Sequence, residues 1–448
     1  MKRLLTILIF AFSLLTAPAF AQDGMTVIRD TEIEQTLRDW STPVWRAAGL
    51  NPDNVKLVLV QSPDLNAFVA GGTNIFVFTG LIAAAKTPGE VIGVIAHETG
   101  HIAGGHLIKG RQAMEHASYE SILAMILGVG AAAAGGGDAS RAIIMGGQGL
   151  ALTSYLAHSR VQESSADQAA LRFLEAAQYS PDGLASFLGT LKNQELMPES
   201  QQSAYFRTHP LTRERIDAME QGDAKSAYKG VPLPASMTEE FKRIKAKLAG
   251  FTEPERVAWI YSDKDDSTPA LYARAIAAYR RSDTDVAIKL IDTLIGREKN
   301  NPWFHEIKGQ MLRDFGRVAD ATKSYREAIR LAPDAALIRI DLAQVLIEMP
   351  NGDYTEAERQ LDEAIKKEPK STQIHRLYAT LYGRQGDEGA AQYHLAEEAA
   401  LRGKTEEAQK LLEGAMTRLK PGTKAYRQAT DLKVYLDAQP KKDDRKKP

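Results

Sequence analysis

The stretch VIAHETGHIAGGHL, residues 94–107, contains three of the nine histidines in a chain of 448 residues. His97 and His101 are four positions apart, so on a helix they lie one turn apart on the same face, where one metal ion can accept both imidazoles. Glu98 points about 100° away from His97 on such a helix. That direction suits a carboxylate that acts on a metal-bound water rather than on the metal itself. The stretch therefore predicts a buried helix with two metal ligands and a general base.

A second stretch, SRVQESSADQAA at residues 159–170, offers a third ligand. Glu163 and Asp167 are again one helical turn apart. Glu163 is predicted to ligate the metal, and Asp167 to accept the outward N–H of a ligand histidine and so set its tautomer. Gly100 and the glycine pair 104–105 are small enough to let this second helix approach the first. Two imidazoles, one carboxylate and an open position are typical of a catalytic zinc site, so we expect one zinc ion per chain.

Two further side chains near these motifs have less definite roles. Gly104 and Gly105 are expected to end the first helix, which takes His106 out of the ligand set and leaves it a structural or supporting role around the ligands. Arg160 precedes Glu163 by three positions on the same helical face. It is a candidate for orienting substrate or for pairing with a carboxylate.

The first residues, MKRLLTILIFAFSLLTAPAFA, have the parts of a secretory signal peptide. Lys2 and Arg3 precede an apolar core, and a small-x-small cleavage site follows at 19–21. We therefore predict a signal peptide over 1–21, because the core is shorter than the ~20 residues that a membrane span needs. The chain has no cysteine and therefore no disulfide. Its net charge of −1 argues against nucleic-acid binding. The style of the leader favours a bacterial periplasm.

The mature chain divides into two parts with different patterns. Strand patterns at 55–62 and 74–82 are followed by helical patterns at 89–103, 107–127 and 152–178. This first part, residues 22–250, is expected to be mainly α with a small β-sheet.

The second part, residues 262–436, is a helical repeat. Residues 302–333 place small side chains at Gly309, Ala321 and Ala328, and the following segments repeat the pattern. A period of about 34 residues is typical of tetratricopeptide repeats, which stack into an α-solenoid whose concave face usually binds peptides or protein segments. The charged tail, residues 437–448, is expected to be disordered.

Residues 121–158 are apolar but interrupted by runs of glycine. The apolar run before Gly135 is too short for a membrane span. Two interpretations have equal support: a glycine-hinged lid or membrane-facing loop over the site, and a helical hairpin with an exposed tip.

Four stretches occur in the same order as in a known family, namely NAFVAGGTNIFVFTGLI, VIAHETGHIAGGH, SRVQESSAD and THPLTRERI. Through them the chain resembles the zinc metallopeptidases related to the heat-shock protease HtpX and the CAAX prenyl protease. The leader and the C-terminal repeats are similar to the periplasmic branch of that family. The resemblance implies a gluzincin-type fold with zinc ligands His97, His101 and Glu163 and catalytic base Glu98. The family's membrane-embedded members have transmembrane helices, whereas here no apolar span of ~20 residues follows the leader, so we expect a soluble or peripheral protein.

The stretch AYFRTHPLTRERI, residues 204–216, contributes one more histidine, for which three roles are open. Pro210 disfavours helix at His209, so this imidazole is predicted on a loop before a helix that starts near Thr212. It could donate to the oxyanion that forms during peptide hydrolysis. It could instead occupy the open zinc position and hold the resting enzyme inactive, or it could precede the helix with no chemical role.

The resemblance implies a periplasmic zinc endopeptidase, with chaperone activity as a second role, in quality control or assembly of outer-membrane proteins. Misfolded or assembling outer-membrane proteins and their assembly machinery would bind the repeats, and the enzyme could associate with the outer membrane. Substrate is expected as an added strand along a sheet edge near 74–78. One alternative is a chaperone or adaptor whose peptidase is mostly silenced. A remote alternative is a zinc hydrolase of sugars or lipids.

Overall fold

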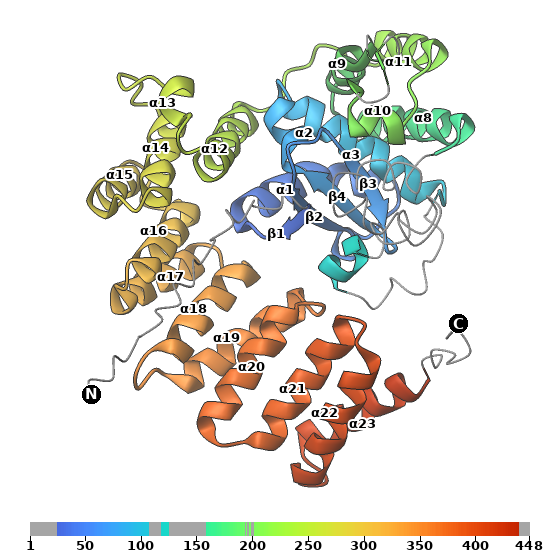
Figure 1. Cartoon of the computed structure of the whole chain (residues 1–448). Coiled ribbons are helices and arrows are strands. Elements are labelled where there is room, and N and C mark those ends of the chain that lie inside the picture. Colours follow the sequence, from blue (N-terminus) through green and yellow to red (C-terminus); the bar gives the residue numbers. More distant parts are fainter. Residues whose placement is uncertain are drawn as a thin grey trace, which may run out of the picture.

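The computed structural model describes residues 25–106, 118–124, 158–192, 194, 197–198 and 201–438. A part built around a small sheet is followed by a curved stack of helices that begins at residue 268 and extends alongside it (Figure 1). The predicted class, mainly α with a small β-sheet and a helical solenoid, is confirmed. The leader 1–21, all of 121–158 except 121–124 and 158, and all but the first two residues of the tail 437–448 lie outside the described residues.

The sheet has four strands in the order β1-β2-β4-β3. Their bounds are β1 Thr26–Ile28, β2 Lys56–Gln61, β3 Ala67–Ala70 and β4 Asn74–Phe78. β2 and β4 are parallel, whereas β1 pairs antiparallel with β2 and β3 with β4. The two predicted strands are β2 and β4. β1 and β3 have only three and four residues and give too little alternation to be predicted separately.

Because β4 pairs with a strand on each side, it has no free edge. The expectation that substrate adds to the sheet near 74–78 is therefore wrong. Among the described residues, β1 and β3 are the edge strands of this sheet. The strand predicted at 74–82 also ends earlier than predicted, because helix α2, Thr79–Ala84, begins directly after β4.

Alternate side chains of the strands enter cores on opposite faces of the sheet. Leu59, Ile75 and Val77 join a core with helix α1, Thr31–Ala47, and helix α3, Pro88–Ala103. The other face carries a smaller core. Its members from the sheet and from residues 118–124 are Val58, Val60, Phe68, Ala70, Phe76, Phe78, Tyr119, Ile122 and Leu123.

Helix α3 confirms the pattern predicted at 89–103. Thr87 caps its start by accepting a hydrogen bond from the Glu90 amide, and Pro88 occupies the first turn, where its missing N–H has no cost. The helix ends at Gly104 and Gly105, as predicted. Its side chains are buried from Val91 to Ile102, so any polar group within this span needs a partner or a function.

Two further helices pack directly on α3. They are α8, Arg160–Ala176, and α9, Asp182–Leu191. A Cβ at Gly100 would meet the Ala166 carbonyl oxygen of α8 at 2.6 Å, so only glycine permits this approach, as predicted for Gly100. α8 begins at Arg160, where Ser159 and Gln162 form a capping box, and residues 152–157 of the predicted helical pattern lie outside the described residues.

Five further helices lie in the described residues of this part of the chain, apart from α1, α2, α3, α8 and α9. They are the 3-10 helix Pro52–Asn54, α10 Ala204–Thr208, α11 Arg213–Lys225, α12 Ala235–Thr252 and α13 Val257–Ile260. No helix in the described ranges is long and apolar enough to cross a membrane.

The repeat part consists of stacked antiparallel helices. Their bounds are α14 Thr268–Arg280, α15 Thr284–Arg297, α16 Pro302–Asp314, α17 Val318–Leu331, α18 Ala336–Glu348, α19 Tyr354–Lys367, α20 Thr372–Gln385, α21 Glu388–Leu401, α22 Thr405–Arg418 and α23 Lys424–Asp437. A Cβ at Gly309 would meet the Tyr325 ring at 2.9 Å, and Ala321 and Ala328 are fully buried. The small residues of the repeat therefore stand where paired helices cross closely.

Helix α12 joins the two parts because it packs on both. Phe241, Ile244 and Leu248 belong to the core of the sheet part. Ala246 packs instead with Ala273 and Ala277 of α14. The repeat helices thus continue from a helix that is already anchored in the first part.

A group of buried charges lies at this junction, and we call Asp30, Glu32, Arg243, Lys247 and Glu306 the interdomain charge cluster. Lys247 Nζ lies 2.8 Å from Asp30 Oδ2 and 3.4 Å from Glu32 Oε2. Arg243 also pairs with Glu32. Glu306, from α16, accepts a hydrogen bond from the Thr31 hydroxyl of α1. The cluster therefore ties the N-terminus of α1 to α12 and to the solenoid.

Candidate metal centre

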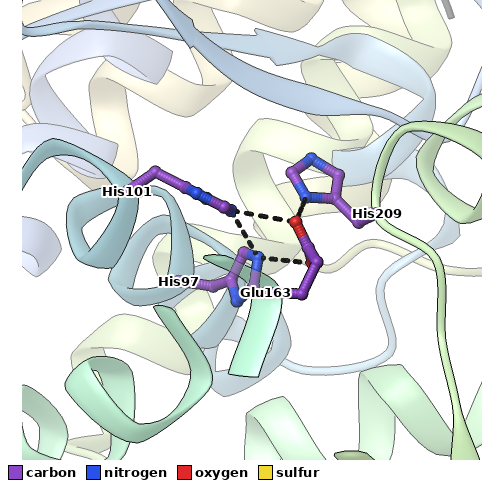
Figure 2. A group of neighbouring side chains, drawn as sticks. All are labelled: His97, His101, Glu163 and His209. Atoms are coloured by element: carbon purple, nitrogen blue, oxygen red, sulfur yellow. Dashed lines mark hydrogen bonds and ion pairs between the residues drawn. The ribbon is translucent and has the colours of Figure 1, made fainter. Parts of the chain in front are cut away.

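Helix α3 brings three polar side chains into an apolar core. His97 and His101 lie one turn apart, Glu98 follows His97, and all three are buried. The Nε2 atoms of His97 and His101 are 3.1 Å apart, so the two rings are directed at the same point (Figure 2). This is the arrangement that the four-residue spacing predicts.

Glu163, in the first turn of α8, joins the histidine pair from the neighbouring helix. Its carboxylate oxygens lie 3.4 Å from His97 Nε2 and 3.2 Å from His101 Nε2. With His209 included, one donor atom from each of the four residues lies within 4.8 Å of the others. Figure 2 shows the four side chains converging on one point.

The geometry and the charge of this group fit a divalent cation. Two nitrogens bound to one tetrahedral zinc at 2.0–2.1 Å stand about 3.3 Å apart, close to the 3.1 Å between His97 and His101. Three buried carboxylates face one buried guanidinium, and three minus one leaves two negative charges for a cation to balance. The carboxylates belong to Glu98, Glu163 and Asp167, and the guanidinium belongs to Arg215.

The surroundings also favour positive charge at this point. Burial lowers the pKa of His97, but hydrogen bonds to Asp167 and Glu163 outweigh burial and raise that pKa to about 10. Burial raises the pKa of Glu163, but His209 and His101 outweigh it and hold that pKa well below its ordinary value. Both shifts indicate that these side chains are arranged around a cation.

Asp167 and Arg215 contact the ligand residues on the side away from the point where the donor atoms meet. Asp167 Oδ1 lies 2.9 Å from His97 Nδ1, the nitrogen that faces away from the cluster. Arg215, on α11, reaches Asp167 with Nε at 2.6 Å and Nη2 at 2.9 Å. Its Nη1 lies 2.8 Å from Glu163 Oε2. One guanidinium therefore orients the carboxylates of Glu163 and Asp167, the bidentate recognition for which arginine is suited.

Arg160 does not pair with Glu163 or Asp167 in the structure, and its predicted role in orienting substrate stays a prediction. Arg160 is the first residue of α8 and its side chain is exposed, whereas Glu163 on the next turn is buried. The arginine that pairs with Glu163 and Asp167 is Arg215. Arg215 lies in the stretch 204–216, but its role could not be predicted from sequence because it depends on α11 packing against α8.

His209 lies at the end of α10, directly before Pro210, and is buried. The predicted loop is confirmed, since α11 begins at Arg213 with Thr212 as its cap. His209 Nδ1 lies 3.0 Å from Glu163 Oε1. Its Nε2 lies 3.3 Å from the Ala67 carbonyl oxygen at the start of β3. His209 therefore occupies the space between the ligand group and the edge strand.

Glu98 differs from the other buried carboxylates. Among the described residues, neither of its oxygens has a hydrogen-bond partner. His209 Nε2 lies 3.5 Å from Glu98 Oε1, which is an electrostatic contact rather than a hydrogen bond. Burial raises the pKa of Glu98, and the nearby His209 and His97 lower it in part. The Glu98 carboxylate therefore lies beside the ligand group and accepts no hydrogen bond from the described residues.

Two more histidines surround His101. His106 Nδ1 lies 3.1 Å from His101 Nδ1. The ring of His158 stacks on the ring of His101 with centroids 3.9 Å apart. Burial, followed by the effect of His209, lowers the pKa of His158 to about 4, so its ring is neutral at ordinary pH. His158 was not predicted to belong to the site, although it directly precedes the motif at 159–170.

With this geometry established, comparison with known proteins is informative. Residues 28–222 match the profile of peptidase family M48. This chain carries a family M48 peptidase domain. Two profiles of tetratricopeptide repeats match residues 272–336 and 312–381. The M48 peptidase domain followed by repeats confirms the resemblance described above, and the chain is a metalloendopeptidase.

Relatives with assigned names agree with this family. The beta-barrel assembly-enhancing protease of Yersinia pestis is 23% identical over 395 residues, which cover 82% of this chain and 75% of that protein. The metalloprotease LoiP of Escherichia coli K12 is 34% identical over 180 residues, 39% of this chain and 66% of its own length. The protease HtpX of Shewanella denitrificans is 37% identical over 81 residues, 17% of this chain and 27% of its own length. The similarity to the first of these extends from the peptidase domain into the repeats.

Proposed function

We propose that this metalloendopeptidase uses one zinc ion held by His97, His101 and Glu163, with Glu98 as the catalytic base. One observation carries the proposal. The donor atoms of the three ligands meet at one buried point, and the carboxylate of Glu98 lies next to them without a partner among the described residues. A buried carboxylate is costly unless a partner or a reaction uses it.

The residues around the ligands suit the hydrolysis of a peptide bond. Zinc at this position would polarise the scissile carbonyl and make water nucleophilic at neutral pH. Glu98 would take the proton from the attacking water and return it to the leaving amine. Arg215 would hold Glu163 and Asp167 in place during this exchange, since it binds both carboxylates from one side.

Edge strand β3 is the proposed docking position for the substrate backbone. β3 starts at Ala67, whose carbonyl oxygen already lies within 3.3 Å of His209. A peptide that adds to the free edge of β3 would pass the ligand group, whereas the other free edge, that of β1, is on the opposite side of the sheet. Strand addition of this kind gives affinity through the main chain and leaves side-chain choice broad.

We further propose that the protein acts in the periplasm on outer-membrane proteins that are misfolded or being assembled. The relatives named beta-barrel assembly-enhancing protease support this role, as does the predicted signal peptide 1–21. The repeats would bind these proteins or their assembly machinery, since solenoids of this type bind protein segments. Chaperone activity and association with the outer membrane belong to the same proposal.

The test is cleavage of casein by the purified protein, compared with Glu98→Gln. The variant keeps all three ligands, so it should retain one zinc per chain while losing at least about a hundredfold in turnover, the usual size of a general-base contribution. Zinc content and casein cleavage are measured on the same preparations. Full activity in Glu98→Gln at equal zinc content would disprove the proposed mechanism.

A second candidate function, a chaperone or adaptor with a mostly silenced peptidase, is favoured by the position of His209. Its Nδ1 lies 3.0 Å from Glu163 Oε1 and belongs to the group of converging donor atoms. A fourth ligand at this point would close the site to substrate. We therefore propose that His209 restrains the resting enzyme.

His209→Ala separates the roles that sequence analysis left open. If His209 caps the site, the change opens the fourth position and proteolysis or self-cleavage should rise at equal zinc content. If His209 instead stabilises the oxyanion, loss of one donor should lower turnover by about a hundredfold or more. An unchanged rate would assign His209 no chemical role.

A further inference from the structure

The turn that ends α3 has a specific geometry. The His106 amide donates to the His101 carbonyl oxygen at 2.9 Å, and the Gly105 amide donates to the Ile102 carbonyl oxygen at 3.1 Å. Gly105 has φ +66°, the left-handed conformation that glycine adopts without strain. These two bonds and the left-handed residue define a Schellman motif, which turns the chain back over the last turn of the helix.

A Schellman motif brings two particular side chains together. The residue after the left-handed glycine usually contacts the residue five positions before it, most often through apolar side chains. Here those residues are His106 and His101. Their contact is between ring nitrogens, with Nδ1 of one 3.1 Å from Nδ1 of the other.

The hydrogen bond between these rings has a direction if His101 ligates a metal. The Nε2 of His101 faces His97 and Glu163, so a neutral His101 that binds through Nε2 must carry its proton on Nδ1. That N–H points at His106 Nδ1, which then accepts and keeps its own proton on Nε2. His106 is half-exposed, so its Nε2 proton can be solvated.

We propose that His106 is a positioning residue for the metal centre, acting through His101. This inference rests on the proposed zinc site. By accepting the Nδ1 proton, His106 sets the tautomer of His101 and the orientation of its ring, as Asp167 does for His97 at 2.9 Å. Hydrogen-bond partners of this kind increase metal affinity by preparing the ligand in its binding form. The stacked ring of His158 holds the same His101 ring from its face.

Gly104 is the second requirement for this contact. A Cβ at Gly104 would meet Cε1 and Nε2 of the His106 ring at 2.6 and 2.7 Å. Gly104 itself has φ −76°, a helical value that any residue adopts. Its smallness is therefore required by the position of the His106 ring and not by the backbone. Each glycine of the pair 104–105 therefore has a role: Gly105 makes the turn, and Gly104 leaves room for the ring that the turn brings back.

The experiment measures the zinc dissociation constant by competition with a chelator, using the full-length mature protein. His106→Ala removes the acceptor and should weaken zinc binding by about 10- to 100-fold. His106→Asn should restore most of the affinity, because the amide oxygen of asparagine occupies nearly the position of Nδ1. Gly104→Ala keeps His106 but displaces its ring, so it should weaken zinc binding as His106→Ala does.

His305→Ala is the matched control, because His305 is a half-exposed histidine of the solenoid, as His106 is of the first part, and contacts the Lys299 carbonyl oxygen rather than the metal centre. The midpoint of thermal unfolding of the metal-free proteins is measured in parallel. Equal zinc affinity in wild type and His106→Ala would overturn the inference, as would a His106→Asn variant as weak as His106→Ala. If wild type itself binds no zinc, the proposed zinc site fails instead.

Discussion

The metal centre and the interdomain charge cluster are both buried groups of carboxylates and cations, yet they differ in how their charges are matched. In the interdomain cluster, Lys247 is held between Asp30 and Glu32, and Tyr272 also donates to Glu32 at 2.8 Å. Asp30 and Glu32 each have a cation of the protein beside them, whereas Glu306 accepts from Thr31 and its Oε2 has no partner among the described residues. In the metal centre, the Nε2 atoms of His97 and His101 face each other at 3.1 Å, and both oxygens of Glu98 lack a partner among the described residues.

The difference indicates which cluster is built for function. A structural network gains stability by satisfying its own groups, because an unmatched buried charge is costly. Glu306 illustrates this in the interdomain cluster: burial raises its pKa to about 8, so at neutral pH its carboxyl is mostly protonated and carries little bare charge. The metal centre instead retains buried polar atoms that have no partner among the described residues, the two oxygens of Glu98 first among them. Such unmatched groups are typical of functional sites.

The largest expected effect comes from removing a ligand. Glu163→Ala leaves two imidazoles where three ligands are needed, so stoichiometric zinc and all measurable proteolysis should be lost. The corresponding change in the other cluster, Lys247→Met, should leave the zinc content at one per chain. Metal analysis of the dialysed proteins decides this, and a Glu163→Ala protein that keeps one tightly bound zinc would remove Glu163 from the ligand set.

An intermediate effect is expected on stability from Lys247→Met. The substitution removes the Lys247 ammonium, so Asp30 and Glu32 lose this counter-charge. Breaking a buried pair in this way lowers the free energy of unfolding by about 3–5 kcal/mol. The control is Lys242→Met on the same helix, whose pair with Glu239 is more than half exposed and should contribute about 0–1 kcal/mol. Denaturant unfolding measures both, and equal stabilities of the two variants would contradict a structural role for the cluster.

The smallest expected effect concerns pH and Glu306. Its folded-state pKa of about 8 exceeds its unfolded value near 4.3, so over that interval the folded state binds more protons than the unfolded state. Stability should therefore fall as pH rises toward 8, by at most about 1.4 kcal/mol per pH unit. Lys247 opposes the shift and Asp30 and Asp341 strengthen it.

Glu306→Gln removes this titration, so the unfolding midpoint should depend less on pH between 5.5 and 8. Glu327→Gln on the neighbouring helix α17 is the control, because Glu327 is exposed, pairs with Arg330 and has a pKa below its ordinary value. A pH profile that is identical in wild type and Glu306→Gln would show that Glu306 is already ionised in the folded state.

The amino-acid sequence alone was enough to predict which residues share one face of a helix. His97 and His101 share a face because an α-helix returns to the same side after four residues, and the same reasoning relates Glu163 to Asp167. The repeat pattern of Gly309, Ala321 and Ala328 predicted the solenoid for a similar reason, since small residues at helix crossings recur with the repeat. These properties depend on neighbours within one or two turns of chain.

Three other features could be seen only in the folded protein, because they depend on contacts between different segments of the chain. Arg215 rather than Arg160 pairs with the carboxylates because α11 packs against α8 with Arg215 on the inner side. β4 proved central because β3 folds back as a short edge strand, a pairing order that a run of strand-forming residues does not specify. His106 reaches His101 because of the hydrogen bonds of one glycine turn. In each case side-chain chemistry was readable from sequence, whereas the partner was set by long-range packing, whose geometry no local pattern encodes.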